Sequence, residues 1–315
     1  MGGKAMSVNV YEKTVPSSDG IHTLYGKVYV PENNNEIRGI VQIVHGKSEH
    51  IGRYERFMTA LAENGYAAFG HNHIGHKKSS PDSELGFFGY DNGFRHLIND
   101  VNVFGDAVSD DFPGKKRYLF GHSMGSFIVR LAVLKSADKL SGLIICGTGG
   151  PQNAARAGLF MCNLVTLLKG GKHVSPLLDK LVFSKYNDKF EKDNPDNWLT
   201  TDRNEVKKFS EDRYSGFSFT ACGMHDLIKL NYVSNKPIWA QAVSKKLPIF
   251  LVAGSDDPVG DFGHGVETVY NRLKKAGCNV KMKLYPGARH ELVNETMKEI
   301  VFDDILTWIE RKVGG

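Results

Sequence analysis

One serine in this sequence stands in a setting that favours nucleophilic chemistry. Residues 121–125 form a G-x-S-x-G pentapeptide with Ser123 at its centre. Apolar residues 118–120 precede it as a strand would, and apolar residues at helical spacing follow it over 127–134. Such a strand-to-helix turn lifts a serine above the carboxyl end of a sheet, where α/β folds bind ligands. The alternative is an ordinary strand-to-helix turn, and the residues described next weigh against it.

A nucleophilic serine needs a base that takes its proton and a third group that orients the base. In this kind of fold the acid and the histidine follow later strands, in that order. Asp256 and Asp257 follow the apolar segment 248–253, and His290 follows the apolar segment 280–285. We therefore expect His290 to be the base and one of the two aspartates to orient it. Capping of a turn is the alternative role for the aspartates, and a surface position is the alternative for His290.

Attack of a serine on an ester also requires backbone N–H donors for the developing oxyanion. The residue after the nucleophile, Met124, should supply one donor. The loop after the early apolar segment 38–44 should supply the other, and Lys47 stands there behind His45 and Gly46. We expect the backbone N–H groups of Lys47 and Met124 to form the oxyanion hole.

The elements that position these residues alternate between strand and helix. Apolar runs predict strands over 21–30, 38–44, 66–69, 117–120, 143–146, 248–253 and 280–285. Helical spacing predicts helices over 53–64, 93–108, 127–134, 266–276 and 292–313. Continuous apolar strands separated by helices are typical of a parallel sheet covered on both faces. The segment 151–246 interrupts the alternation, so we predict an α/β core over 1–150 and 247–315 with an inserted cap over 151–246.

Further blocks in a fixed order accompany the pentapeptide. They are His45-Gly46 with Glu49-His50, Arg53-Tyr54, Gly75-His76 with Ser79, Asp257-Pro258-Val259-Gly260 and Gly287-Ala288-Arg289-His290-Glu291. With these blocks the chain resembles the α/β-hydrolase fold serine hydrolases of the monoacylglycerol lipase and lysophospholipase type, grouped with the serine aminopeptidases of family S33. The resemblance covers nearly the whole chain.

The resemblance implies an eight-stranded, mostly parallel sheet flanked by helices, with a helical cap inserted after the sixth strand. It implies a serine esterase or lipase that cleaves carboxylic esters of apolar acyl chains through a triad and an acyl-enzyme, without a metal or organic cofactor. The spacing within the family selects Asp257 over Asp256, so the expected triad is Ser123, Asp257 and His290.

Three positions depart from the family pattern. Lys47 replaces a small or apolar residue, so its side chain adds a charge beside the oxyanion hole or points to solvent. Asn72 replaces a common aspartate and Lys77 a common glycine. We expect the last two to affect packing rather than chemistry.

Three other functions compete with the esterase. An aminopeptidase of the same fold would need a carboxylate in the cap for the substrate's amino terminus. The candidates are Asp179, Asp188, Asp202, Glu205, Glu211, Asp212 and Asp226. A zinc hydrolase would use His71, His73 and His76, although Gly75 stands where that motif wants an aspartate. The third alternative is a non-catalytic binding module on a hydrolase scaffold. The presence of all the triad residues argues against it.

Composition limits the remaining classes. The 315 residues carry a net charge of +5 and 41% hydrophobic residues, which fits a globular protein and is too weakly basic to predict nucleic-acid binding. No apolar run is long enough to span a membrane, and residues 1–10 lack the apolar core of a secretory signal. The four cysteines form no CxxC pair. We expect a cytoplasmic protein.

The surplus positive charge lies in one part of the chain. Segment 151–246 holds 15 basic and 10 acidic residues, so the rest of the chain is neutral. The same segment contains several apolar clusters that would serve as packing or as walls for an acyl chain. A solvated cap surface is one reading of the charge. The other is that the basic, apolar cap makes transient contact with an anionic substrate or lipid surface.

Overall fold

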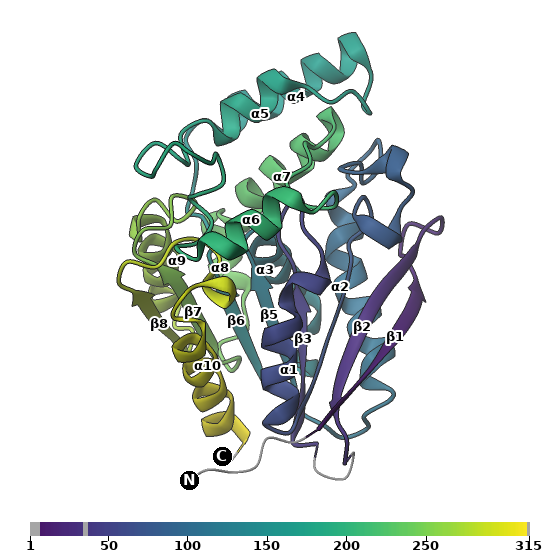
Figure 1. Ribbon diagram of the computed structural model, residues 1–315, viewed down its shortest axis with the longest axis vertical. Helices are drawn as coiled ribbons and strands as arrows, with labels where there is room; N and C mark the ends of the chain where they lie inside the picture. The colour runs from purple at the N-terminus through teal and green to yellow at the C-terminus, as the bar shows by residue number, and fades with distance from the viewer. Residues whose placement is uncertain (1–6, 34–36, 314–315) are drawn as a thin grey trace.

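The computed structural model describes residues 7–33 and 37–313, and eight strands within them form one sheet (Figure 1). The strands are β1 Val8–Pro16, β2 Thr23–Pro31, β3 Gly39–Val44, β4 Tyr66–His71, β5 Arg117–His122, β6 Gly142–Cys146, β7 Ile249–Gly254 and β8 Val280–Tyr285. They lie in the order β1-β2-β4-β3-β5-β6-β7-β8. All neighbours from β4 to β8 are parallel, whereas β2 pairs antiparallel with β1 and with β4.

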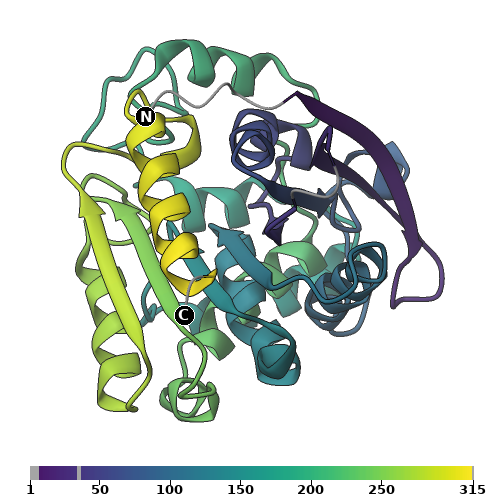
Figure 2. The ribbon, with the colours of Figure 1, turned by 90° about the horizontal axis from the view of Figure 1, so that it is seen from below.

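The central strands are apolar because both faces of the sheet are covered. Every residue of β3, β4, β5, β6 and β7 is buried. Helices α1 Glu55–Glu63 and α10 Lys298–Val313 pack on one face, and α2 Phe94–Ser109, α3 Met124–Ser136 and α9 His264–Lys275 pack on the other. Seen from below, β1 and β8 lie at opposite ends of the twisted sheet (Figure 2). The predicted α/β architecture with an eight-stranded, mostly parallel sheet is confirmed.

Five helices lie between β6 and β7, in the interval predicted to form the cap. They are α4 Ala155–Lys169, α5 Pro176–Phe183, α6 Arg203–Glu211, α7 Ala221–Ser234 and α8 Pro237–Ala242. Helix α7 packs against α3 and α4, so it joins the outer helices to the core. Helices α4 and α5 form the end of the molecule farthest from the sheet (Figure 1). The interval contributes no strand to the sheet.

Two elements differ from the sequence-based expectation. Strand β1 was not expected, because its residues are mostly polar or exposed on the edge of the sheet. The last helix begins at Lys298 rather than at residue 292, because Leu292–Asn294 form a separate 3-10 turn. The carboxylate of buried Glu295 accepts hydrogen bonds from the backbone of Arg289 and Thr201 at this point, which breaks the helix. Other 3-10 turns occupy Ile51–Tyr54, Lys77–Ser79, Asp82–Glu84 and Ala137–Lys139.

The cysteines and the helices bear on two further expectations. Cys146, Cys162, Cys222 and Cys278 are all buried free thiols. Within the described ranges, no helix combines the length and apolarity needed to cross a membrane. The prediction about a secretory signal concerns residues 1–10, of which 1–6 lie outside the described residues.

A buried arginine joins the core to the last two helices of the insert. Arg130 of α3 is 1% exposed, and its guanidinium donates to the backbone of Ser234 at 2.5 Å and to Asn235 Oδ1 at 3.1 Å. Its charge lies 4.3 Å from the ring centroid of Trp239. Burial and the nearby Arg272 lower the pKa of Arg130 to about 9. The cation is therefore held by neutral oxygens and an aromatic face.

Replacing Arg130 by alanine should destabilise the protein by about 3 kcal/mol, because a cavity opens and several buried acceptors lose their donor. Denaturant unfolding of Arg130→Ala against wild type measures this. Lys135→Ala is the control, since Lys135 is exposed on the same helix and should change stability by less than about 0.5 kcal/mol. Equal stability of the two variants would contradict the assigned role.

Candidate active site

Ser123 occupies a strained turn between β5 and α3. Its backbone has φ 54° and ψ −121°, a conformation that costs a non-glycine residue about 1–3 kcal/mol. The turn is held by a hydrogen bond from Ser123 N to Cys146 O at 3.1 Å. A Cβ at Gly125 would lie 2.1 Å from the Val44 carbonyl oxygen, so only glycine lets α3 start this close to β3. The pentapeptide has the geometry of a nucleophile elbow.

Asp257 and His290 form a buried pair at the same edge of the sheet. Asp257 lies three residues beyond the end of β7, and His290 lies in the loop beyond β8. His290 Nδ1 is 3.0 Å from Asp257 Oδ1, and the two side chains are 2% and 0% exposed. Asp256 is exposed and accepts from its neighbour Ser255. The geometry therefore favours Asp257 as the partner of the histidine.

The loops that carry Ser123 and His290 lie side by side. His122, directly before the serine, has its ring centroid 4.7 Å from that of His290, and its Nε2 is 3.2 Å from His290 O. Trp198 of the insert covers the other side, with its centroid 5.1 Å from the His290 ring. The histidine predicted from sequence to be the base thus contacts His122 of the core and Trp198 of the insert.

The loop after β3 meets the serine directly. A Cβ at Gly46 would lie 3.0 Å from the Cβ of Ser123, which places the backbone of Lys47 near Ser123. In the part of the chain that the structure describes, the backbone N–H groups of Lys47 and Met124 have no hydrogen-bond acceptor. Both donors are therefore available to an oxyanion formed at Ser123.

A buried carboxylate holds this loop in place. Glu49 Oε1 accepts from Gly46 N at 2.5 Å and from Tyr54 Oη at 2.8 Å, and it lies 3.3 Å from His122 Nδ1. Arg53 contacts the other oxygen of Glu49, with Nε 3.4 Å from Oε2. Arg53 also pairs with Glu291, the residue after His290. One ionic network therefore links the loops after β3, β5 and β8.

The network shifts the titration of its members. Burial would raise the pKa of Glu49, but contacts with His122, Arg53 and Tyr54 outweigh it and lower the pKa to about 2. Burial would lower the pKa of His122, but the Glu49 carboxylate reverses the sign and raises it. Glu49 is therefore ionised at neutral pH. From sequence, Glu49 and Arg53 are visible only as family markers. The signal for the role of Glu49 is its three-residue spacing from Gly46.

Four histidines lie near the end of β4 and do not converge on a common point: His45, His71, His73 and His76. His73 Nε2 lies 3.1 Å from His45 O, and His76 Nδ1 lies 3.1 Å from Ile74 O, so ring nitrogens are engaged by the backbone. His71 packs on Phe104 with ring centroids 4.7 Å apart. Burial lowers the pKa of all four, to about 4 for His73 and about 3 for His76, so these rings are neutral at physiological pH.

Residues 7–33 and 37–313 contain no group of three or more histidine, cysteine, aspartate or glutamate side chains placed to hold a metal ion. The zinc alternative built on His71, His73 and His76 is therefore wrong on geometry. These side chains serve packing behind the site. Asn72 also serves packing, as expected, because its Oδ1 accepts from Ile51 N at 3.0 Å.

A family model gives the fold and this site a wider context. The model described as serine aminopeptidase, S33, matches residues 35–297, which is well over half of the chain. The chain belongs to the S33 family. A monoglyceride lipase homolog of monkeypox virus is 26% identical to this S33 chain over 88% of the chain and 91% of the relative. Human monoglyceride lipase is 24% identical over 87% of the chain and 83% of the relative.

Solved structures resemble the S33 chain just as extensively. A thermostable carboxyl esterase from Bacillus coagulans, in complex with glycerol, has a TM-score of 0.90 and 29% identity, and covers 96% of this chain and 99% of its own. A structure described as a lipase in its open form has a TM-score of 0.88 and 26% identity, covering 98% and 100%. The S33 chain is a carboxylic ester hydrolase of the serine-hydrolase type.

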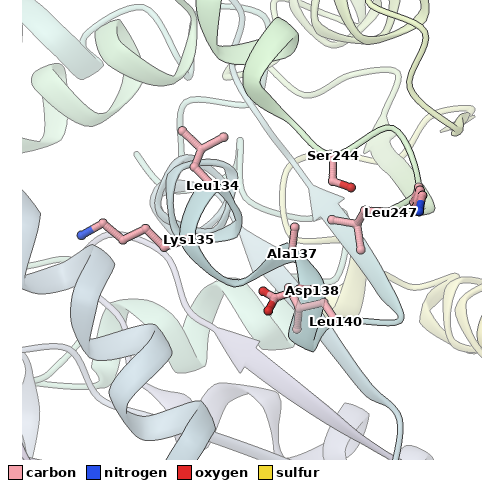
Figure 3. Close-up of a pocket in the computed structure, with 8 residues that line it drawn as sticks. Leu134, Lys135, Ala137, Asp138, Leu140, Ser244 and Leu247 are labelled. Atoms are coloured by element: carbon pink, nitrogen blue, oxygen red, sulfur yellow. The ribbon is translucent and has the colours of Figure 1, made fainter.

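A surface hollow of the S33 chain lies away from this site. Its lining comes from the end of α3 and the turn before β6, together with residues just before β7 (Figure 3). Leu134, Asp138 and Leu247 are among the residues that form it. Residues that precede parallel strands lie at the amino edge of the sheet, opposite the edge that carries Ser123. This hollow therefore has no part in the chemistry of the serine.

Replacing Glu49 by glutamine should lower stability by about 3 kcal/mol, because Arg53 and His122 lose a buried counter-charge. It should also lower kcat, because a neutral amide holds the Gly46 loop, Arg53 and His122 less firmly than the carboxylate does, while Ser123 stays in place. Denaturant unfolding and ester hydrolysis measure the two effects. Glu211→Gln, which removes an exposed carboxylate of α6, is the control and should change stability by less than about 1 kcal/mol. Unchanged stability of Glu49→Gln would rule out the network.

Proposed function

We propose that this hydrolase cleaves esters of apolar acyl chains, of the monoacylglycerol or lysophospholipid type, with Ser123, His290 and Asp257 as its triad. The observation that carries the proposal is the buried His290–Asp257 pair, 3.0 Å apart, at the sheet edge where the strained Ser123 turn lies. The relatives described as monoglyceride lipases support the substrate class.

The first step forms an acyl-enzyme. His290 takes the proton of Ser123 while the hydroxyl oxygen attacks the ester carbonyl, and Asp257 stabilises the imidazolium through Nδ1. The N–H groups of Lys47 and Met124 hold the oxyanion. His290 then donates the proton to the departing alcohol.

The second step is hydrolysis of the acyl-enzyme. Water takes the place of the alcohol, and His290 removes its proton as the oxygen attacks the acyl carbonyl. The same two N–H groups hold the second oxyanion. Collapse of this intermediate releases the carboxylic acid and returns the proton to Ser123, so no cofactor enters the cycle.

The cap supports an apolar acyl group. Trp198 lies against His290, and Tyr186 lies against Trp198 with centroids 5.0 Å apart. Phe217 and Phe219 approach the loop after β3 from the insert, since the carbonyl of Phe217 accepts from Ser48 Oγ. Aromatic walls with few polar groups are typical of sites for apolar ligands.

The aminopeptidase alternative is less well supported. It requires a free carboxylate in the cap, but Asp212 binds His50 at 2.6 Å and Glu205 binds Lys208 at 2.7 Å. The Lys47 ammonium beside the serine would also repel a protonated amino terminus. Asp179 has no ion-pair partner among the described residues, so it is the remaining candidate for such a contact.

A fluorophosphonate probe should label wild type and fail to label Ser123→Ala, since only the serine oxygen can attack the phosphorus. The variant should lose at least about 10⁴-fold in kcat on 4-nitrophenyl acyl esters. Ser109→Ala, with a serine at the end of α2, is the control and should keep its labelling. Turnover of aminoacyl anilides without turnover of esters would refute the proposed substrate class.

We further propose that the cap contacts an anionic lipid surface through α4 and α5. One face of α4 carries exposed apolar side chains at helical spacing, with Leu167 82% and Leu168 71% exposed. The apolar surface continues along the chain; its other members are Phe160, Leu164, Val174, Leu177 and Leu181. Lys169 and Lys180 are exposed beside it. Apolar side chains flanked by lysines suit the boundary of an anionic membrane.

Binding to phosphatidylglycerol-containing vesicles should fall about tenfold or more when Leu167 and Leu168 are both replaced by serine, because less apolar surface enters the lipid. Vesicle flotation measures the bound fraction. Ile238→Ser is the control, because Ile238 is also exposed but lies on α8. Binding that is equal on phosphatidylcholine vesicles and insensitive to salt would contradict the electrostatic part of the proposal.

The proposal includes a cytoplasmic location. Four buried free thiols without a disulfide suit a reducing compartment.

A further inference from the structure

The side chain of Lys47 places a cation between the loop after β3 and the cap. Its Nζ donates to Ser48 Oγ at 2.9 Å and to the carbonyl oxygen of Phe217 at 3.3 Å. The ammonium also lies 4.6 Å from the ring centroid of Phe183 and 4.8 Å from that of Phe219. The side chain therefore points under the cap and not into solvent, which decides between the two orientations expected from sequence.

The charge of Lys47 has no carboxylate partner. Within the described ranges, no aspartate or glutamate oxygen lies within 4.0 Å of its Nζ. Arg53, the other cation close to the site, contacts two carboxylates, Glu49 and Glu291. Burial lowers the pKa of Lys47 to about 8, and the more distant Asp179 and Asp196 only partly oppose this. Among the described residues, the Lys47 ammonium therefore lies beside the site without a carboxylate in direct contact.

The hydrogen bonds of Lys47 to described residues use two of its donors. An ammonium has three N–H donors, and the two oxygens that it contacts are neutral. Aromatic faces stabilise a cation only by about 0.5–2 kcal/mol. A carboxylate or phosphate would offset more of the desolvation, since charge-assisted hydrogen bonds are about twice as strong as neutral ones.

We propose that Lys47 is a specificity-determining residue, whose ammonium binds an anionic group on the substrate. The preferred substrates are esters that carry a carboxylate or phosphate a few bonds from the acyl carbonyl. This inference rests on the proposed function, which sets the separation between the anionic group and the acyl carbonyl. If the N–H of Lys47 holds the oxyanion, the ammonium is one lysine side chain away from the reacting carbon.

A purely structural role is the competing explanation. Lys47 would then only hold the cap to the core through Phe217 and the rings of Phe183 and Phe219. Loss of these contacts would lower kcat/KM on all esters alike and would leave the ratio of kcat/KM between anionic and neutral substrates unchanged. The ratio therefore separates the two roles.

The test compares two matched pairs of esters. One pair places the charge on the acyl side, as 4-nitrophenyl hydrogen adipate against 4-nitrophenyl hexanoate. The other places it on the alcohol side, as 1-acylglycerol 3-phosphate against 1-acylglycerol. Wild type should show a higher kcat/KM for the anionic member of one pair, and that pair identifies whether a carboxylate or a phosphate is the source of the anion.

Replacing Lys47 by methionine should reduce this anionic-to-neutral ratio about 10- to 100-fold, mainly through KM. Lys47→Arg should keep most of the preference. Lys77→Met is the matched control, because Lys77 is a partly buried lysine near the cap residue Tyr214 and should keep the wild-type ratio. Calorimetry with Ser123→Ala should show tighter binding of adipate than of hexanoate, and the added Lys47→Met change should remove the difference.

Two results would overturn the inference. If wild type hydrolyses neutral esters, is labelled at Ser123 and shows no anionic preference in either pair, the role of Lys47 is wrong while the proposed function stands. A ratio equal in wild type and Lys47→Met has the same meaning. If no ester is hydrolysed and Ser123 is not labelled, the proposed function fails and the role of Lys47 fails with it.

Discussion

The site depends on a single buried carboxylate, that of Glu49. Its oxygens receive the backbone N–H of Gly46, the hydroxyl of Tyr54 and contacts from His122 and Arg53. The loops after β3 and β5 therefore meet at one charge, and Arg53 links that charge to Glu291 in the loop after β8. A carboxylate that is buried from solvent is tolerable when its charge is balanced. Here Oε1 accepts two hydrogen bonds, and Arg53 lies beside Oε2, which accepts no hydrogen bond from the described residues. The same contacts of Glu49 fix the position of the loop after β3 relative to Ser123.

The two cations near the nucleophile differ in how they are balanced. Arg53 forms ion pairs with Glu49 and Glu291 and belongs to the structure of the site. Lys47 is engaged by neutral oxygens and aromatic rings of the insert. A cation with no counter-charge on the substrate side of the loop alters which ligands are favourable there. If the proposed roles of Lys47 and of Ser123, Asp257 and His290 hold, specificity is decided where the loop after β3 meets the insert, and the triad makes no contribution to it.

The fold was predictable where burial dominates the choice of residues. Strands β3 to β7 are buried on both faces, so their sequences are continuous apolar runs and were identified. Strand β1 was not predicted, because an edge strand with exposed side chains has no such apolar run. Only its pairing with β2 makes it a strand. The break between Leu292–Asn294 and α10 was not predicted either, because it involves a hydrogen bond that the N–H of the distant Thr201 donates to the Glu295 carboxylate.

The sequence by itself determined the order of the proposed triad residues and the turns that carry them. The glycines around Ser123, the apolar run before Asp257 and the position of His290 after the last strand are local features, and local features are visible in one dimension. Only the tertiary structure decided that Glu49 organises the loops, that the histidines near β4 serve packing, and that Lys47 points under the cap. Each of these depends on partners from another part of the chain, since Phe217 lies 170 residues from Lys47 and His122 lies 73 from Glu49. Electrostatic and packing contacts are set by distance in space, which chain order alone does not specify.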